Sequence, residues 1–114
     1  MISKVFRYGL IASLILFLRK SSETILNRSF QRRFANQSMS IGPDSYISDS
    51  RNIVFGEYFY AGRGLWLESV GVDGAVKFGN SVRASNNVHI ASLSNITIGD
   101  NVLIGSNVLI SDHS

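Results

Sequence analysis

Two histidines, His89 and His113, are the side chains of this 114-residue chain that exchange protons most readily near neutral pH. A histidine can act as a base that takes the proton from a hydroxyl group as its oxygen attacks an acyl carbon, provided that donors stabilise the oxyanion. The chain has no cysteine, so disulfides and thiolate metal sites are excluded. A zinc site of the three-histidine type needs three ligands at suitable spacing, and the two histidines, separated by 24 positions, do not provide them. General acid–base chemistry is therefore what these side chains could perform.

The two histidines lie in different local contexts. His89 alternates with Val88 and Ile90 in a strand-like run, so its side chain is expected to point away from the core. A surface histidine with no role is the commoner case for such a position. His113 lies in the sequence SDHS, directly after the last of a series of short repeats. His113 is therefore the candidate catalytic residue of this chain.

The elements that would position His113 follow a six-residue repeat. Ile98, Ile104 and Ile110 are six residues apart, and a glycine or a serine follows each of them. Such a repeat predicts a solenoid whose coil has three flat faces, each made of one short strand and one turn. Traced backwards, the inward position falls on apolar residues: Ala35, Ile41, Ile47, Phe55, Ala61, Leu67, Phe78, Ala84, Ile90, Ile98, Ile104 and Ile110.

The step of six is interrupted at three places, after Ile47, Leu67 and Ile90. Each interruption follows the third unit of a coil, so every insertion is expected at the same corner of the solenoid. Glycine follows the inward residue in six of the eleven units from Ile41 to Ile110, as suits a tightly bent backbone. We expect parallel strands stacked about 4.8 Å apart, with the inward residues from Phe78 to Ile110 buried. Asparagines are expected to serve the turns: Asn80, Asn86, Asn87, Asn101 and Asn107.

The segment NNVHIASLSNITIGDNVLIGSNVLISDHS resembles the hexapeptide-repeat acyltransferases, and a weaker likeness extends back to about Ile41. Within that family it is closest to the sugar O-acetyltransferases of bacterial lipopolysaccharide and capsule synthesis. The resemblance implies a left-handed parallel β-helix, acetyl-coenzyme A as acyl donor, a sugar hydroxyl as acceptor and a homotrimer. It places the protein in the bacterial cytoplasm. An incomplete β-helix of about four coils, preceded by two short α-helices, is the expected fold.

The resemblance also bears on the candidate site residues. It places the catalytic histidine one residue beyond Ser114, in a pattern resembling DH-x-HG, so that His113 is the first histidine of the pattern. The family often has an asparagine that shapes the acceptor site at the position of Ser85, and here Asn86 follows one step later. The later coils complete the coenzyme A groove and the trimer in the family. We therefore expect this chain to be the N-terminal part of an O-acetyltransferase, truncated or inactive by itself.

The charge of the chain is divided unevenly. Residues 1–34 carry seven Lys or Arg and one acidic residue, about +6 by count, whereas residues 35–114 are about −3. We expect a basic helical segment at 1–34 and a β-helix domain at 35–114. The β-helix domain has no basic stripe, so nucleic acid is not an expected partner. A basic N-terminal segment is typical of contact with an anionic surface.

The apolar run from Tyr8 to Leu18 is flanked by basic residues. Eleven helical residues span roughly 17 Å, which is too short to cross a bilayer core of about 30 Å. A second helix is expected from Ser22 to Phe34, with Ile25, Leu26, Ser29 and Phe30 on one face. The N-terminal segment either lies on the inner membrane surface or caps the first coil. The alternative to an enzyme is a noncatalytic membrane-surface solenoid that acts as an interaction module.

Overall fold

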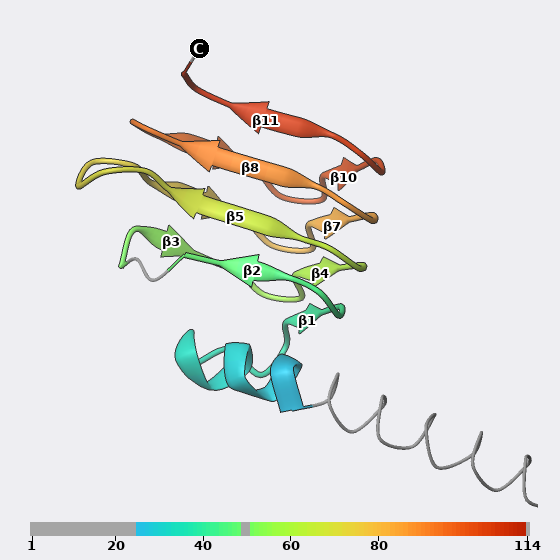
Figure 1. The fold of residues 1–114 in the computed structure, drawn as a ribbon. Helices are drawn as coiled ribbons and strands as arrows, with labels where there is room; N and C mark the ends of the chain where they lie inside the picture. The colour runs from blue at the N-terminus through green and yellow to red at the C-terminus, as the bar shows by residue number, and fades with distance from the viewer. Residues whose placement is uncertain (1–24, 49–50, 114) are drawn as a thin grey trace, which may run out of the picture.

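The computed structural model describes residues 25–48 and 51–113. A short helix at residues 25–33 is followed by a parallel β-solenoid of about four turns (Figure 1). The mainly β solenoid expected from the six-residue repeat is therefore confirmed. The first of the two expected helices lies outside the described residues.

The strands of the solenoid form three parallel sheets. Sheet A consists of β1 (Ser40–Ile41), β4 (Tyr60–Ala61), β7 (Arg83–Ala84) and β10 (Leu103–Ile104). Sheet B consists of β2 (Tyr46–Ile47), β5 (Trp66–Ser69), β8 (His89–Ser92) and β11 (Leu109–Ser111). Sheet C consists of β3 (Ile53–Val54), β6 (Val76–Phe78) and β9 (Ile96–Ile98). We call β1–β3 coil 1, β4–β6 coil 2, β7–β9 coil 3, and β10 with β11 coil 4.

The inward residues expected from the repeat stack above one another in the solenoid. In sheet B, Leu67 pairs with Ile90 and Ile90 pairs with Ile110, which places one apolar side chain per coil in the same position. The burial expected for the inward residues from Phe78 to Ile104 is confirmed, and the inward residues Ala61 and Leu67 of coil 2 are buried as well. Ile110, in contrast, is only half-buried. A second buried residue, which the step of six did not indicate, lies two positions before the inward one in most units: Met39, Ile53, Phe59, Leu65, Val76, Val82, Val88 and Ile96.

One inward assignment near the start of the solenoid needs correction. Ala35 is exposed, with φ of 49°, because it follows the last turn of the helix rather than a strand. The amide of Asn36 donates to the carbonyl of Gln31 at 2.9 Å, which closes the helix through this left-handed residue. Met39 is the buried residue that precedes β1. Phe55 is half-buried, and its ring stacks on Phe78 at a centroid distance of 5.2 Å.

The corners between sheets use left-handed residues at repeated positions. After sheet A they include Asn87 and Asn107, with φ of 57° and 60°, and after sheet C they include Asn101, with φ of 58°. Asparagine tolerates this conformation better than most residues, which confirms the turn role of these three. Asn80 and Asn86 act differently, since each side chain accepts a backbone N–H of the coil below, from Glu57 at 2.8 Å and Arg63 at 2.9 Å.

The helix at 25–33 covers the open end of coil 1. Phe30 is buried in the core, and Leu26 packs against it. The side chain of Asn27 accepts the backbone N–H of Ile41 at 2.8 Å. Of the four residues expected on one face, Leu26 and Phe30 lie on the inner face together with Phe34, whereas Ile25 and Ser29 are exposed. No helix among the described residues is both long and apolar enough to cross a membrane.

Candidate functional site

The candidate catalytic histidine lies at the end of sheet B in coil 4. His113 lies two residues after the end of β11, and its side chain is 34% exposed. The Nδ1 atom of its imidazole lies 3.2 Å from the Ser111 hydroxyl and 3.4 Å from Oδ1 of Asp112. The Ser111 hydroxyl donates its only proton to the His113 carbonyl at 2.9 Å. Its oxygen is therefore an acceptor toward the ring, which favours a proton on Nδ1 and leaves the Nε2 lone pair available.

Asp112 is held by the corner of the coil below. Its Oδ2 atom accepts the Ser92 hydroxyl at 2.9 Å, the Ser94 amide at 2.9 Å and the Asn95 amide at 2.7 Å. Its Oδ1 atom accepts the Leu93 amide at 2.7 Å. The carboxylate thus receives four donors from residues 92–95. This contact fixes the direction of the chain on either side of Asp112.

The position of Asp112 follows from the stacking of coils. Ser111 pairs with Ala91 in the parallel ladder between β11 and β8, so the next residue lies above Ser92. The hydrogen bond from the Leu93 amide is the main cause that holds the pKa of the Asp112 carboxyl well below its ordinary value, and the Ser94 amide and Ser92 hydroxyl add to it. A carboxylate so held is ionised and engaged. It is suited to orient the neighbouring imidazole rather than to act as a base itself.

The two candidate acceptor-site residues lie at a different corner. Ser85 and Asn86 follow β7, at the corner between sheets A and B, whereas His113 follows the far end of sheet B. The carboxamide oxygen of Asn86 is occupied by the Arg63 amide, and the Asn86 amide donates to the Ser106 hydroxyl at 3.3 Å. Within one chain the structure therefore does not bring Ser85 or Asn86 beside His113.

His89 points away from the core, as its alternation with apolar neighbours predicts. It lies in register with Trp66 and Tyr46 on the outer face of sheet B. The ring centroids of Trp66 and His89 are 5.9 Å apart, and those of Tyr46 and Trp66 are 4.5 Å apart. His89 has no acidic residue as a hydrogen-bond partner in the described part of the chain. It is therefore the less suitable histidine for acid–base chemistry.

Two features of the described residues were not found from the sequence. Asp112 was not singled out, although a coil length of about 20 residues would place it above the Ser92–Asn95 corner. The other feature is a hollow of about 710 Å³ beside the helix, lined by Arg28, Gln31, Arg32, Ala35 and Gln37. None of these lining residues belongs to coil 4. In residues 25–48 and 51–113, no group of three or more acidic or histidine side chains is placed to hold a metal ion.

Comparison with known proteins adds no relative. No protein-family model matches the chain, and neither a curated protein nor a solved structure is significantly similar to it. The function must therefore be argued from the repeat, the solenoid and the geometry of the corner that carries His113.

Proposed function

We propose that this chain is part of an O-acetyltransferase that moves acetyl from acetyl-coenzyme A to a sugar hydroxyl of a surface polysaccharide. The polysaccharide is the O-antigen of lipopolysaccharide or a capsule, and the enzyme is a left-handed β-helix that acts as a trimer in the bacterial cytoplasm. The observation that carries the proposal is the Ser111–Asp112–His113 corner, where Asp112 is locked by four donors and holds the imidazole. The two substrates are inferred from the resemblance of the surrounding coils to the hexapeptide-repeat acyltransferases.

The chemistry requires one proton transfer and one exchange of bonds. A base accepts the proton of the sugar hydroxyl while the sugar oxygen forms a bond with the thioester carbonyl carbon. The carbon–sulfur bond then breaks, and the departing thiolate of coenzyme A receives the proton. Nε2 of His113 has the available lone pair, and the contacts of Nδ1 with Ser111 and Asp112 would stabilise the imidazolium that forms.

The base is either His113 or a histidine outside these 114 residues, because the family pattern contains a second histidine. Two forms of the protein separate these cases: this chain, and a version extended by further hexapeptide coils that include the DH-x-HG pattern. Binding of acetyl-coenzyme A is measured by calorimetry for both. Acetyl transfer to polysaccharide precursors is measured by release of the coenzyme A thiol.

The two histidines provide a matched pair of variants. Loss of a general base lowers the rate by roughly 10² to 10⁴. If His113 is the base, His113→Ala shows this loss in this chain and His89→Ala does not. If only the extended form transfers acetyl, the base lies in the added coils and this chain is inactive by itself. The proposal fails if neither form binds acetyl-coenzyme A or transfers acetyl, and a noncatalytic solenoid module then remains.

A further inference from the structure

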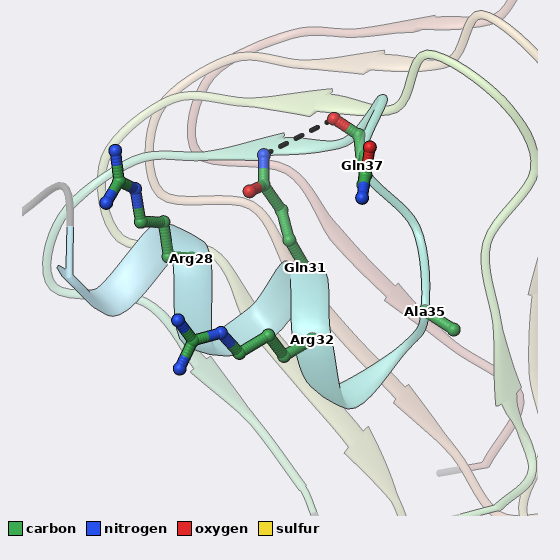
Figure 2. A pocket seen from close by; sticks show the side chains of 5 residues that line it. All are labelled: Arg28, Gln31, Arg32, Ala35 and Gln37. Carbon is green, nitrogen blue, oxygen red and sulfur yellow. Dashed lines mark hydrogen bonds between the residues drawn. The ribbon is translucent and has the colours of Figure 1, made fainter.

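The helix at residues 25–33 has an outer face that points away from coil 1. Ile25, Arg28 and Arg32 are separated by three and four residues, so they lie on the same side of the helix. All three are exposed, and Ile25 is 65% exposed. Figure 2 shows Arg28 and Arg32 projecting from the helix beside Gln31. This outer face combines an apolar side chain with two guanidinium groups.

The hollow of about 710 Å³ beside this face is lined by the two arginines and by no carboxylate. Gln31, which lies between them, is already engaged. Its Nε2 atom donates to the carbonyl of Met39 at 2.9 Å. It also donates to the carbonyl of Gln37 at 3.4 Å (Figure 2). Neither Arg28 nor Arg32 forms an ion pair with any residue of 25–48 or 51–113. Two adjacent guanidinium groups without an acidic partner suit the oxygen atoms of a phosphate.

Arg33, on the same helix, has a structural role that Arg28 and Arg32 lack. Its Nη1 atom donates to the carbonyl of Ile47 at 2.9 Å, and its Nη2 atom donates to the carbonyl of Ser48. These bonds attach the helix to coil 1. Arg28 and Arg32 make no comparable contact with the solenoid, so the fold itself does not account for their charges.

We propose that the face formed by Ile25, Arg28 and Arg32 docks on a membrane surface that contains anionic phospholipid. The guanidinium groups would bind headgroup phosphates, and Ile25 would enter the boundary between headgroups and acyl chains. The preceding sequence is complementary to the same surface, since residues 1–24 carry four Lys or Arg against one Glu and include the apolar run from Tyr8 to Leu18. The docking surface does not depend on the proposed acetyl transfer, because it uses none of the residues at the coil 4 corner.

The placement of the helix gives this docking surface a consequence for the rest of the molecule. Figure 1 shows the helix beneath coil 1, at the opposite end of the stack from β11. Docking through the helix would bring coil 1 toward the membrane. The corner that carries His113 would then lie at the far end of the solenoid, accessible from the aqueous side.

The test is sedimentation of the full chain with vesicles. The chain is expected to bind vesicles of phosphatidylcholine mixed with phosphatidylglycerol, to bind phosphatidylcholine alone weakly, and to dissociate from the mixed vesicles as salt is added. Replacing both Arg28→Gln and Arg32→Gln should weaken binding to the mixed vesicles roughly thirtyfold, since each basic residue near an anionic surface contributes about fivefold. Both side chains are exposed, and circular dichroism would verify that the variant is folded.

Matched variants separate docking by this face from general charge attraction. Lys77→Gln with Arg83→Gln removes the same two charges from the outer faces of sheets C and A, and should change binding by less than about threefold. Arg28→Lys with Arg32→Lys keeps the charge and should keep most of the binding. Equal losses for the two Gln pairs would overturn the proposal. So would loss of binding in the Lys pair, equal binding to both kinds of vesicle, or release from vesicles by glycerol phosphate, which would indicate a site for a small phosphate.

Discussion

Gly79 and Gly99 occupy the same position one coil apart, yet their surroundings differ. A Cβ atom added at Gly79 would lie 2.7 Å from the carbonyl carbon of Gly99 and 2.8 Å from the amide nitrogen of Asp100. A Cβ atom added at Gly99 would have nothing within 4 Å. The coil above therefore leaves no room for a Cβ atom at Gly79, whereas no described residue restricts Gly99 in this way. The same residue in the same register has a different structural role at the top of the solenoid.

The same difference recurs in the core. Ile90 and Ile110 pair in the ladder between β8 and β11, but Ile90 is 0% exposed and Ile110 is only half-buried. Val102 and Val108 in coil 4 are likewise half-buried, whereas Val82 and Val88 in coil 3 are fully buried. In a solenoid each coil is stabilised chiefly by its neighbours. Coils 2 and 3 have a coil on both sides, and coil 4 has a described coil only below.

The largest effect is expected when the paired isoleucines are replaced one at a time. Ile90→Ala should lower the free energy of unfolding by about 2–5 kcal/mol, because it leaves a cavity in a fully packed interior. Ile110→Ala should cost about 1 kcal/mol, because the side chain is already half in contact with water. Urea unfolding followed by circular dichroism measures both. Equal losses would mean that the upper face of coil 4 is covered in solution.

The glycine pair gives a smaller but cleaner effect. Gly79→Ala should destabilise the protein by about 1–3 kcal/mol, because the methyl group meets backbone atoms of the next coil that cannot move independently. Gly99→Ala should be neutral or stabilising by about 0.4–1 kcal/mol, because its φ lies outside the left-handed region and the replacement restricts the unfolded chain. The midpoints of thermal unfolding compare the two variants. A marked loss of stability for Gly99→Ala would contradict the open upper face.

Asp112 accepts four hydrogen bonds that link coil 3 to coil 4, and its effect should depend on pH. Its pKa is lowered in the folded state, so the contribution of the ionised carboxylate is complete above its ordinary value of about 3.8. That contribution is lost as the pH falls through the lower folded pKa. Asp112→Asn should therefore unfold more easily than the wild type at neutral pH, and the two should converge in strong acid.

Denaturation midpoints across a pH series measure this convergence, with Asp73→Asn as control. Asp73 is exposed and carries the same charge, but forms no hydrogen bond with the rest of the described chain. It should show neither the loss at neutral pH nor the convergence. A constant difference between the Asp112 variant and the wild type down to the lowest pH would mean that the carboxylate is not the group that links the two coils.

The smallest effect is expected for the ion pair between coils 1 and 2. Arg63 and Asp44 are 2.6 Å apart, but their side chains are 45% and 72% exposed. Arg63→Gln should lower stability by no more than about 1 kcal/mol, and added salt should reduce the difference from the wild type. Denaturant unfolding at low and high salt measures it. A larger loss of stability that does not depend on salt would contradict this expectation. It would mean that Asp44, like Asp112, links two coils strongly despite its exposure.

The six-residue period was sufficient to predict the solenoid and about half of its buried core. An apolar side chain at every sixth position points into the coil whether the solenoid is left-handed or right-handed. Ala84, Ile90 and Ile98 could therefore be assigned to the core without coordinates. The period did not indicate the second set of buried residues, which lies two positions before the inward ones in all three sheets, as Leu65, Val76 and Val82 show. It failed at Ala35, because a residue that closes a helix obeys the contacts of that helix and not the repeat.

The local pattern by itself determined the repeat, the asparagine turns and the outward direction of His89. The tertiary structure alone decided that Asp112 meets the corner at residues 92–95, because such a contact depends on how the length of one coil sets the register of the next. It also decided which face of the helix is buried and which of its arginines the solenoid uses. The same stacking placed Ser85 and His113 at separate corners. Periodicity identifies the inner side of a strand, but only the packed coils fix which distant residues come into contact.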